Sequence, residues 1–204
     1  MIHRVHLDRY AADAVNPGVA GNARFSPIKT KLGSPIPTLY GGTSFDCAAL
    51  ETVFHDVPFV AGFKSHDRRK VQGQLHSCLL ATRDLVLVDL SNVALRKLGP
   101  TRRQLIDTEK DAYPRTRQWA AAIHAQCPGV QGLSWISRQD DRAQALMLFG
   151  DRVPPGTLRP QGEPRNLLRN RAAYVELLSL AERIGVEWVA GQSDTVLAAL
   201  NTGN

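Results

Sequence analysis

The chain has 204 residues, of which 43% are hydrophobic and 22% are charged. This composition is that of an ordinary soluble globular protein, and the length supports one sizeable hydrophobic core. The 25 Lys and Arg residues exceed the 19 Asp and Glu residues, so the formal net charge is +6. Such a charge favours anionic partners: nucleic acid, a phosphorylated small molecule or an acidic protein.

The sequence contains no membrane or secretion signal. No segment approaches the ~20 apolar residues of a membrane helix, and the first residues lack the apolar stretch of a secretory signal. Cys47, Cys78 and Cys127 are odd in number, far apart and without a CxxC pair. This pattern is typical of free thiols in a reducing compartment. We therefore expect a cytoplasmic protein that does not contact the membrane.

Basic residues recur in three stretches, at 64–70, 96–103 and 152–171. We interpret these stretches as solvated loops and helix faces. None of them carries the interleaved aromatic residues of a surface that stacks nucleic-acid bases. Direct binding of nucleic acid is therefore not expected.

Strand-like and helix-like segments alternate along the chain without internal repeats. The hydrophobic pattern predicts strands at 2–7, 37–40, 132–136, 145–149 and 186–189, a hairpin of strands 75–80 and 85–90, and helices at 116–126, 167–184 and 193–200. Residues 16–37 are predicted to form a long connection, and the Pro- and Gly-rich residues 151–164 a linker. We expect an α/β (α+β) fold with a mixed central sheet flanked by helices. Residues 1–204 would form a single domain, with its motif-bearing core at about 2–150 and a closing helix–strand–helix at 165–204.

A strand that ends at Tyr40 is followed by two glycines and the start of a helix. Thr43 or Ser44 can cap that helix, and Asp46 lies in its first turn, where a carboxylate opposes the positive end of the helix dipole. The sequence therefore defines where the helix of this strand–helix unit begins.

One carboxylate stands beside the apolar stripe of this helix. The stripe contains Leu50, Val53, Phe54 and Val57 at helical spacing. Glu51 lies about 90° round the helix from it, and small residues and His55 share its flank. From spacing alone, Glu51 is either a boundary residue of an amphipathic helix or a carboxylate beside a ligand.

Two arginines precede this unit. Arg4 lies in the first strand, and Arg24 lies in a Gly-Asn-Ala-Arg-Phe-Ser-Pro stretch that is typical of an ordered loop. Guanidinium groups bind phosphate oxygens in a bidentate manner. From the sequence alone, both arginines can equally have structural roles. The same holds for Tyr40 as a core residue, and for Ser137 as a turn residue.

Several well-known catalytic motifs are absent. The six histidines show no HExxH or paired metal spacing, so no metal site is expected. The sequence has no GxGxxG after a strand, no GxxxxGK[ST] and no GxSxG. These absences argue against a Rossmann dehydrogenase, a P-loop enzyme and a serine hydrolase.

The chain resembles the RES domain, which is named for an Arg, a Glu and a Ser. The resemblance rests on the order of Arg4, Arg24, the unit from Tyr40 to Glu51, and Ser137 along the chain. The resemblance covers about residues 2–149. It implies a sheet similar to the ADP-ribosyltransferase core and a toxin that destroys NAD. It also implies the roles of the site residues: Glu51, Arg4 and Ser137 would be catalytic, and Arg24, Tyr40, Arg4 and His55 would bind NAD. Ser134 is a second candidate for the serine of the family.

The resemblance gives these residues chemical roles. A fixed carboxylate stabilises the oxocarbenium-like state that forms when nicotinamide leaves the ribose. Tyr40 would stack on nicotinamide or donate its hydroxyl, and Ser137 would bind the nicotinamide amide or the ribose. NAD is then a substrate, no cofactor is expected, and phosphate or water accepts the ADP-ribosyl group.

A cognate antitoxin, an Xre-like helix-turn-helix protein, would cover the active site of such a toxin. Two alternatives stay open at this point. One is a protein ADP-ribosyltransferase of the same fold. The other is a non-enzymatic basic module that binds nucleic acid or protein.

Overall fold

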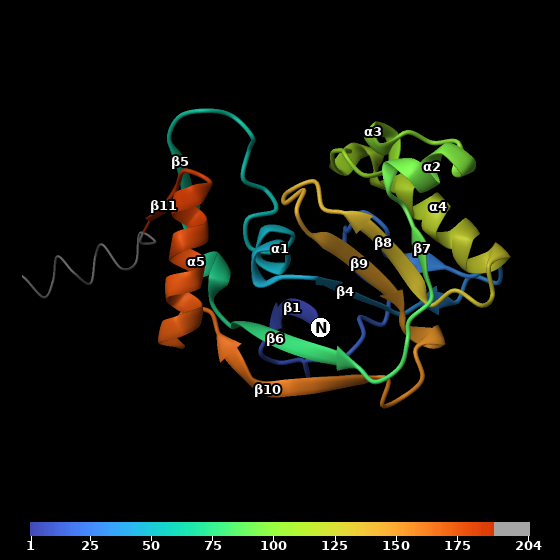
Figure 1. Ribbon diagram of the computed structural model, residues 1–204, viewed down its shortest axis with the longest axis horizontal. Helices are drawn as coiled ribbons and strands as arrows, with labels where there is room; N and C mark the ends of the chain where they lie inside the picture. The colour runs from blue at the N-terminus through green and yellow to red at the C-terminus, as the bar shows by residue number, and fades with distance from the viewer. Residues whose placement is uncertain (190–204) are drawn as a thin grey trace, which may run out of the picture.

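A mixed seven-stranded sheet forms the centre of the computed structural model, which describes residues 1–189 (Figure 1). Neighbouring strands are antiparallel except for the parallel pair β7–β8. The strands, in their order across the sheet, are β10 (Leu158–Asn166), β6 (Gln74–Ala81), β1 (Ile2–Leu7), β4 (Thr38–Gly42), β9 (Gln144–Phe149), β8 (Gly132–Ile136) and β7 (Leu87–Asp89). The protein is a single α+β domain, as the sequence predicted. Its likeness to the ADP-ribosyltransferase core stays a prediction.

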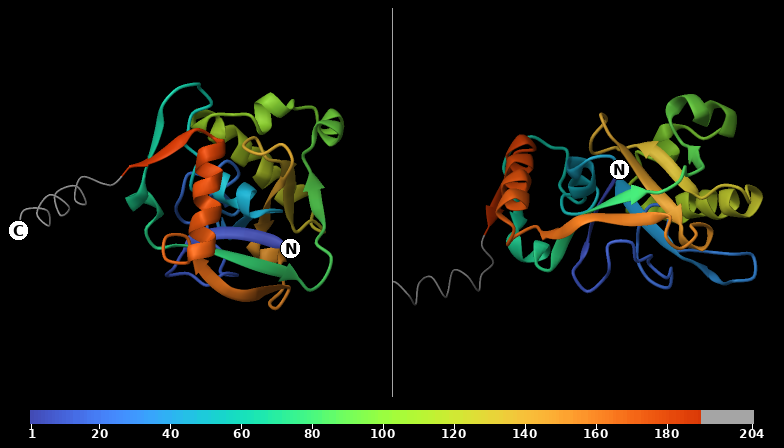
Figure 2. Two further views of the ribbon diagram at one scale, coloured as in Figure 1. Left: turned by 60° about the vertical axis from the view of Figure 1, so that its left-hand side comes forward. Right: turned by 60° about the horizontal axis from the view of Figure 1, so that its bottom comes forward.

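Helices cover the sheet at both ends. Figures 1 and 2 show α4 with α2 and α3 beside β7 and β8, α5 near the other end of the sheet, and α1 between them. Two small sheets join β2 to β3 and β5 to β11. These elements are α1 (Phe45–Leu50), α2 (Asn92–Leu98), α3 (Arg102–Leu105), α4 (Tyr113–Gln126), α5 (Arg171–Arg183), β2 (Ile28–Lys29), β3 (Pro35–Ile36), β5 (Lys64–Asp67) and β11 (Val186–Val189), with 3₁₀ turns η1 (Arg68–Val71), η2 (Lys110–Ala112) and η3 (Gly150–Arg152).

Alternation along the central strands divides the buried apolar residues between the two sheet faces. On β9, Met147 packs with Ala120 of α4, whereas its neighbour Leu148 packs with Leu39 and Leu79 in a separate cluster. A third cluster joins α1 and α5 and includes Leu177 of α5. The site described below lies between the parts of the molecule that contain α1 and α4.

The two halves of the sheet meet at a single residue pair. β1 pairs with β6 along its whole length and β4 pairs with β9 along its whole length, but β1 and β4 pair only through His3 and Gly42. A Cβ on the neighbouring Gly41 would lie 2.4 Å from Cγ2 of Ile2, so this crossing needs a residue without a side chain. Apart from the pair of His3 and Gly42, no backbone ladder joins β1 to β4 among the described residues.

Several predicted elements are confirmed, among them the strands at 2–7, 132–136, 145–149 and 186–189 and the helices that became α4 and α5. The connection at 16–37 contains only the short strands β2 and β3. The helix predicted at 193–200 lies outside the described residues. No helix among residues 1–189 is long and apolar enough to cross a membrane.

The predicted hairpin of strands 75–80 and 85–90 is wrong. β6 lies between β1 and β10, whereas β7 pairs with β8 at the opposite edge of the sheet. Alternation of apolar and polar residues identifies a strand but does not say which strand it pairs with. Two strands that are consecutive in the sequence were therefore predicted to pair with each other.

The predicted linker at 151–164 contains most of strand β10 instead. β10 forms an edge of the central sheet, and its register shifts between Gln161 and Arg165. An edge strand tolerates prolines such as Pro160 and Pro164, because one side of its backbone needs no ladder partner. The Pro- and Gly-rich composition of residues 151–164, which is typical of loops, therefore led to a wrong prediction for this strand. Likewise, the basic stretch at 64–70, expected as a loop, contains β5 and part of η1.

Candidate active site

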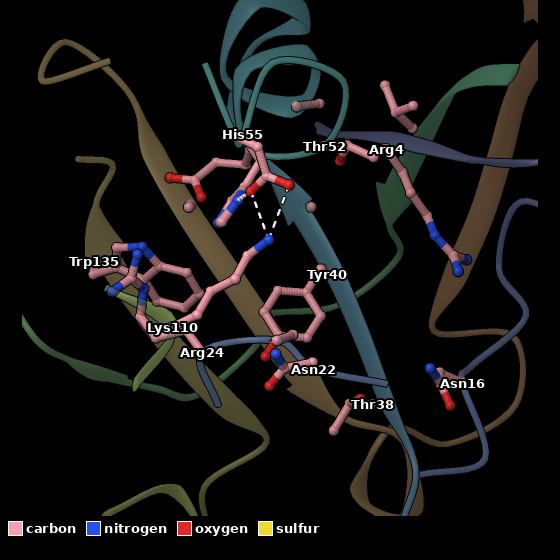
Figure 3. A pocket seen from close by; sticks show the side chains of 17 residues that line it. Arg4, Asn16, Asn22, Arg24, Thr38, Tyr40, Thr52, His55, Lys110 and Trp135 are labelled. Carbon is pink, nitrogen blue, oxygen red and sulfur yellow. Dashed lines mark hydrogen bonds and ion pairs between the residues drawn. The ribbon is translucent and has the colours of Figure 1, made fainter. Parts of the chain in front are cut away.

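A cavity of about 420 Å³ lies where β1 and β4 separate. Five of the six residues that the sequence singled out line it. Figure 3 shows Arg4 and Asn16 on one side of Tyr40, and Arg24, Lys110 and Trp135 on the other. The lining residues are Arg4, Val5, Asn16, Asn22, Ala23, Arg24, Thr38, Tyr40, Gly41, Ala48, Glu51, Thr52, His55, Asp56, Lys110, Trp135 and Ala145.

Glu51 reaches the cavity from the C-terminal end of α1. Ser44 caps the start of this helix by accepting a hydrogen bond from the Cys47 N–H at 3.0 Å. The helix ends at Leu50 with Glu51 as its C-cap, so the longer helix predicted through Val57 is wrong. The Thr52 N–H already bonds to the Ala49 carbonyl three residues back, which tightens the chain into turns. Glu51 therefore lies where the α-helix passes into turns, with its own backbone still in the helical conformation.

Ser137 holds the Glu51 carboxylate. Its hydroxyl donates to Glu51 Oε1 at 2.6 Å, and its Oγ accepts the backbone N–H groups of Gln139 and Asp140 at 3.0 and 3.1 Å. The residue is fully buried. With these three bonds made, Ser137 has no hydroxyl proton left for nicotinamide or ribose. In this structure Ser137 contacts Glu51, and its expected contact with substrate stays a prediction.

The rival serine, Ser134, belongs to β8. It neighbours Trp135, which lines the cavity, so the two side chains point to opposite faces of the sheet. The geometry favours Ser137 over Ser134 as the serine associated with Glu51.

Arg24 extends from an ordered loop, as predicted. Its guanidinium donates to Oγ1 of Thr108 at 2.7 Å and lies over the ring of Tyr113, 5.4 Å from the centroid. Thr116 of α4 donates to the Arg24 carbonyl and fixes the loop backbone. Burial of the side chain lowers the pKa of Arg24, although Tyr113 and Glu51 oppose this shift.

Arg4 lies on the other side of Tyr40 from Arg24 (Figure 3). Its Nη1 donates to the Ala12 carbonyl at 2.5 Å. Burial lowers the pKa of Arg4 to about 10, and Asp13 partly offsets this effect. At neutral pH the group stays charged, so the cavity holds two guanidinium cations that approach from different sides.

Tyr40 is fixed through its hydroxyl, which accepts the Phe25 N–H at 3.1 Å. Burial raises the pKa of Tyr40 to about 12. The ring meets Trp135 edge-on, with the centroids 6.4 Å apart. Tyr40 and Trp135 thus give the cavity an aromatic wall, with Tyr40 between the two arginines.

His55 belongs to a chain of hydrogen bonds that the sequence analysis missed. Its Nδ1 donates to Asp56 at 2.8 Å, so its Nε2 accepts the Tyr113 hydroxyl at 3.2 Å. Lys110 contacts both oxygens of Asp56 at 2.8 and 2.9 Å. The hydrogen bonds from Lys110 and then His55 lower the pKa of Asp56. Only the adjacency of His55 and Asp56 could have suggested this chain, since Lys110 and Tyr113 are distant in sequence.

Cys47 of α1 does not line the cavity. Its side chain is fully buried, and burial raises the pKa of the thiol to about 12. A thiolate is the reactive form of cysteine.

A family model of the RES domain matches residues 1–170, a span that contains every residue of the site. The chain belongs to the RES domain family. This family is associated with NAD-degrading toxins of toxin–antitoxin systems, which indicates an enzyme that acts on NAD. The RES match extends past residue 149, where the resemblance was expected to end, and it includes β10. No curated protein matches the chain.

Proposed function

We propose that this RES domain protein is a toxin that cleaves NAD at the nicotinamide–ribosyl bond, with phosphate or water as acceptor. The observation that carries the proposal is the Glu51 carboxylate, anchored by Ser137 in a cavity that also holds two arginines. The proposed fold relation to the ADP-ribosyltransferase core is consistent with such a reaction but is not needed for the argument.

Glu51 would stabilise positive charge during bond cleavage. As nicotinamide departs, the ribose approaches an oxocarbenium ion, and a preorganised anion beside it lowers the barrier. Nicotinamide leaves as a neutral molecule, so no strong general acid is required. Ser137 engages Oε1, and we propose that Oε2 serves the ribose. Because Ser137 fixes the carboxylate beforehand, little reorganisation is needed in the transition state.

The arginines and aromatic residues would bind the rest of NAD. Arg4 and Arg24 offer planar donors for the pyrophosphate oxygens. The aromatic wall of Tyr40 and Trp135 suits the flat nicotinamide ring. The cavity volume of about 420 Å³ falls within the usual range for ligand pockets, about 300–1,000 Å³.

Phosphate is the acceptor that the charges favour. Lys110, which pairs with Asp56, and Arg24 lie on one side of the cavity (Figure 3). A phosphate beside Lys110 would share the positive charge of Arg24 with the pyrophosphate. Phosphate would yield ADP-ribose 1″-phosphate, whereas water would yield ADP-ribose. Incubation of the purified protein with NAD, with and without phosphate, tests both steps through nicotinamide release and product mass. Absence of nicotinamide release under both conditions would refute the proposed activity.

An Xre-like antitoxin is the proposed protein partner. Just beyond the cavity wall at His55 and Asp56, the chain exposes three apolar side chains: Phe59 (69%), Val60 (61%) and Phe63 (74%). Exposed apolar side chains close together are a common feature of protein-binding surfaces. A partner seated there would lie next to the cavity.

Expression in cells separates the toxin from the nucleic-acid alternative. For the toxin, expression should drain the NAD pool and arrest growth, and Glu51→Gln should relieve both effects. A nucleic-acid binder would arrest growth regardless of Glu51, and its binding would weaken steeply with salt. Growth arrest with an unchanged NAD pool would contradict the toxin proposal.

A further inference from the structure

Three potential metal ligands converge on the sheet, away from the cavity lining. His3 of β1 pairs directly with Cys78 of β6, so their side chains share one face of the sheet. His76 lies two residues before Cys78 on β6 and therefore projects from the same face. The fold thus brings together residues that are 73 positions apart in the chain. The spacing of histidines and cysteines along the chain predicted no metal site.

The distances between the ligand atoms match those around a tetrahedral metal ion. Nδ1 of His3 lies 3.0 Å from Nε2 of His76, and the Cys78 Sγ lies 3.8 and 3.9 Å from these nitrogens. Zinc binds histidine nitrogen at about 2.0–2.1 Å and thiolate sulfur at about 2.3 Å. At tetrahedral angles these bond lengths place two nitrogens about 3.3 Å apart and nitrogen and sulfur about 3.6 Å apart. In the structure these two nitrogens face one another across a hydrogen bond, with the ring centroids 5.2 Å apart and the ring planes 22° apart. Metal binding would replace this hydrogen bond and turn both rings so that their nitrogen lone pairs converge on the ion.

The surroundings hold the histidines in place. His76 is almost fully buried, and its ring packs edge-on against Phe45 with the centroids 5.0 Å apart. Arg165 of β10 donates to Nδ1 of His76 at 3.0 Å and forms a bidentate pair with Glu176 at 2.9 and 3.0 Å. The Nε2 atom of His76 therefore faces His3 and Cys78, while the other side of the ring faces a neutralised ion pair.

We propose that His3 Nδ1, His76 Nε2 and the Cys78 thiolate bind Zn²⁺, with water as the fourth ligand. Two imidazoles and a thiolate are a donor set that zinc prefers over harder cations. On binding, the Cys78 thiol loses its proton to solvent, and the His76 proton moves from Nε2 to Nδ1, so the hydrogen bonds that Arg165 donates to Nδ1 must break. Glu176, which Arg165 holds beside this ring, is the carboxylate that can accept the Nδ1 proton in a hydrogen bond.

Such an ion would add a link between β1 and β6, which already pair along their whole length, beside the single residue pair that joins β1 to β4. His3 is the residue of β1 that pairs with Gly42 of β4, and it directly precedes Arg4 of the cavity. Zinc would therefore stabilise the strand that carries Arg4. The proposal does not depend on NAD cleavage, because its test measures metal binding alone.

The test uses the untagged full-length protein, stripped with a chelator and titrated with Co²⁺ and with Zn²⁺ in competition with a chromogenic chelator. We expect one metal ion per chain, the visible bands of tetrahedral Co²⁺ and a thiolate-to-cobalt charge-transfer band. In Cys78→Ser the charge-transfer band should vanish and zinc affinity should fall at least about 100-fold, since even outer partners of metal ligands contribute 10- to 100-fold. Cys127→Ser, a change of another partly buried cysteine, should bind metal like the wild type.

A second variant keeps the test decisive if Cys78→Ser does not fold. His3 is only partly buried, so His3→Gln should fold, as circular dichroism would verify, and should also lose metal binding. Thermal unfolding with and without zinc adds a separate measurement, because a ligand that binds only the folded state raises Tm. Failure of the wild type to bind stoichiometric zinc would overturn the proposal. So would unchanged zinc affinity in folded Cys78→Ser or His3→Gln protein.

Discussion

The hydroxyl of Ser137 donates a 2.6 Å hydrogen bond to Oε1 of Glu51, although 86 residues separate the two. Glu51 lies at the end of α1 and Ser137 directly after β8. The bond therefore ties the end of α1 to the end of β8, which lies two strands from β4 in the sheet. It fixes the carboxylate without supplying a positive charge that would reduce its effect on a cationic transition state.

Glu51→Gln should preserve the fold and remove most activity. The amide has the size of the carboxylate and can still accept the Ser137 hydrogen bond, but it lacks the charge that stabilises an oxocarbenium ion. Loss of one such electrostatic contact typically lowers the rate by about 10²–10³-fold. Nicotinamide release at matched protein concentration measures the effect, and circular dichroism verifies the fold. Wild-type turnover in a folded variant would refute the proposed role of Glu51.

Ser137→Ala should lower kcat more than it changes KM for NAD. The carboxylate loses its anchor, and a displacement of about 1 Å can reduce a rate about 100-fold. The N–H groups of Gln139 and Asp140 lose their acceptor, which should reduce stability by about 1–3 kcal/mol. Ser134→Ala is the matched control and should leave kcat unchanged. A rise of KM for NAD at unchanged kcat in Ser137→Ala would indicate instead that Ser137 binds substrate directly.

The sequence revealed the site residues better than it revealed the contacts between them. Local patterns placed Glu51, Arg24 and Tyr40 after a capped helix start, in a glycine-containing loop and at a strand end, but it was the resemblance to the RES domain that assigned them to a site. Ser137 was recognised as well, but its bond to Glu51 depends on how β8 meets α1. Local patterns do not encode such pairings over long sequence distances.

The same limit explains the errors in the fold. β6 was recognised as a strand, yet its neighbours are β1 and β10 rather than β7. β10 was missed because an exposed edge strand needs neither apolar alternation nor freedom from proline. The cluster of His3, His76 and Cys78 forms only once β1 and β6 are in register, so spacing along the chain could not predict it.

Arg24→Lys should weaken NAD binding by about 1–3 kcal/mol, the scale of a charged hydrogen bond. Lysine keeps the charge but loses the planar pair of donors. Calorimetry in a Glu51→Gln background measures binding without turnover. Arg138→Lys is the matched control, because Arg138 also donates to the Thr108 carbonyl but does not line the cavity. Equal dissociation constants for the two variants would assign Arg24 a structural role only.

Gly41→Ala should destabilise the protein by about 1–3 kcal/mol, the usual cost of an added methyl group in a packed region. The new Cβ would meet Cγ2 of Ile2 at 2.4 Å and the His3 carbonyl at 3.0 Å. Chemical denaturation measures the effect. Gly129→Ala is a suitable control, since a Cβ there has no neighbour within 4 Å. Wild-type stability of Gly41→Ala would show that β1 and β4 can separate at their crossing without cost.

Lys110→Met should distinguish the two proposed acceptors. Its ammonium group lies on the cavity side that would hold phosphate, bound to Asp56 at 2.8 Å. Removal of this charge should raise KM for phosphate severalfold, because a close opposite charge strengthens anion binding. Hydrolysis of NAD in phosphate-free buffer should change little, since neutral water gains nothing from the ammonium group. Lys97→Met, on exposed α2, controls for the loss of one net charge. If Lys110→Met slowed both reactions equally, Lys110 would act through Asp56 and His55 rather than on phosphate.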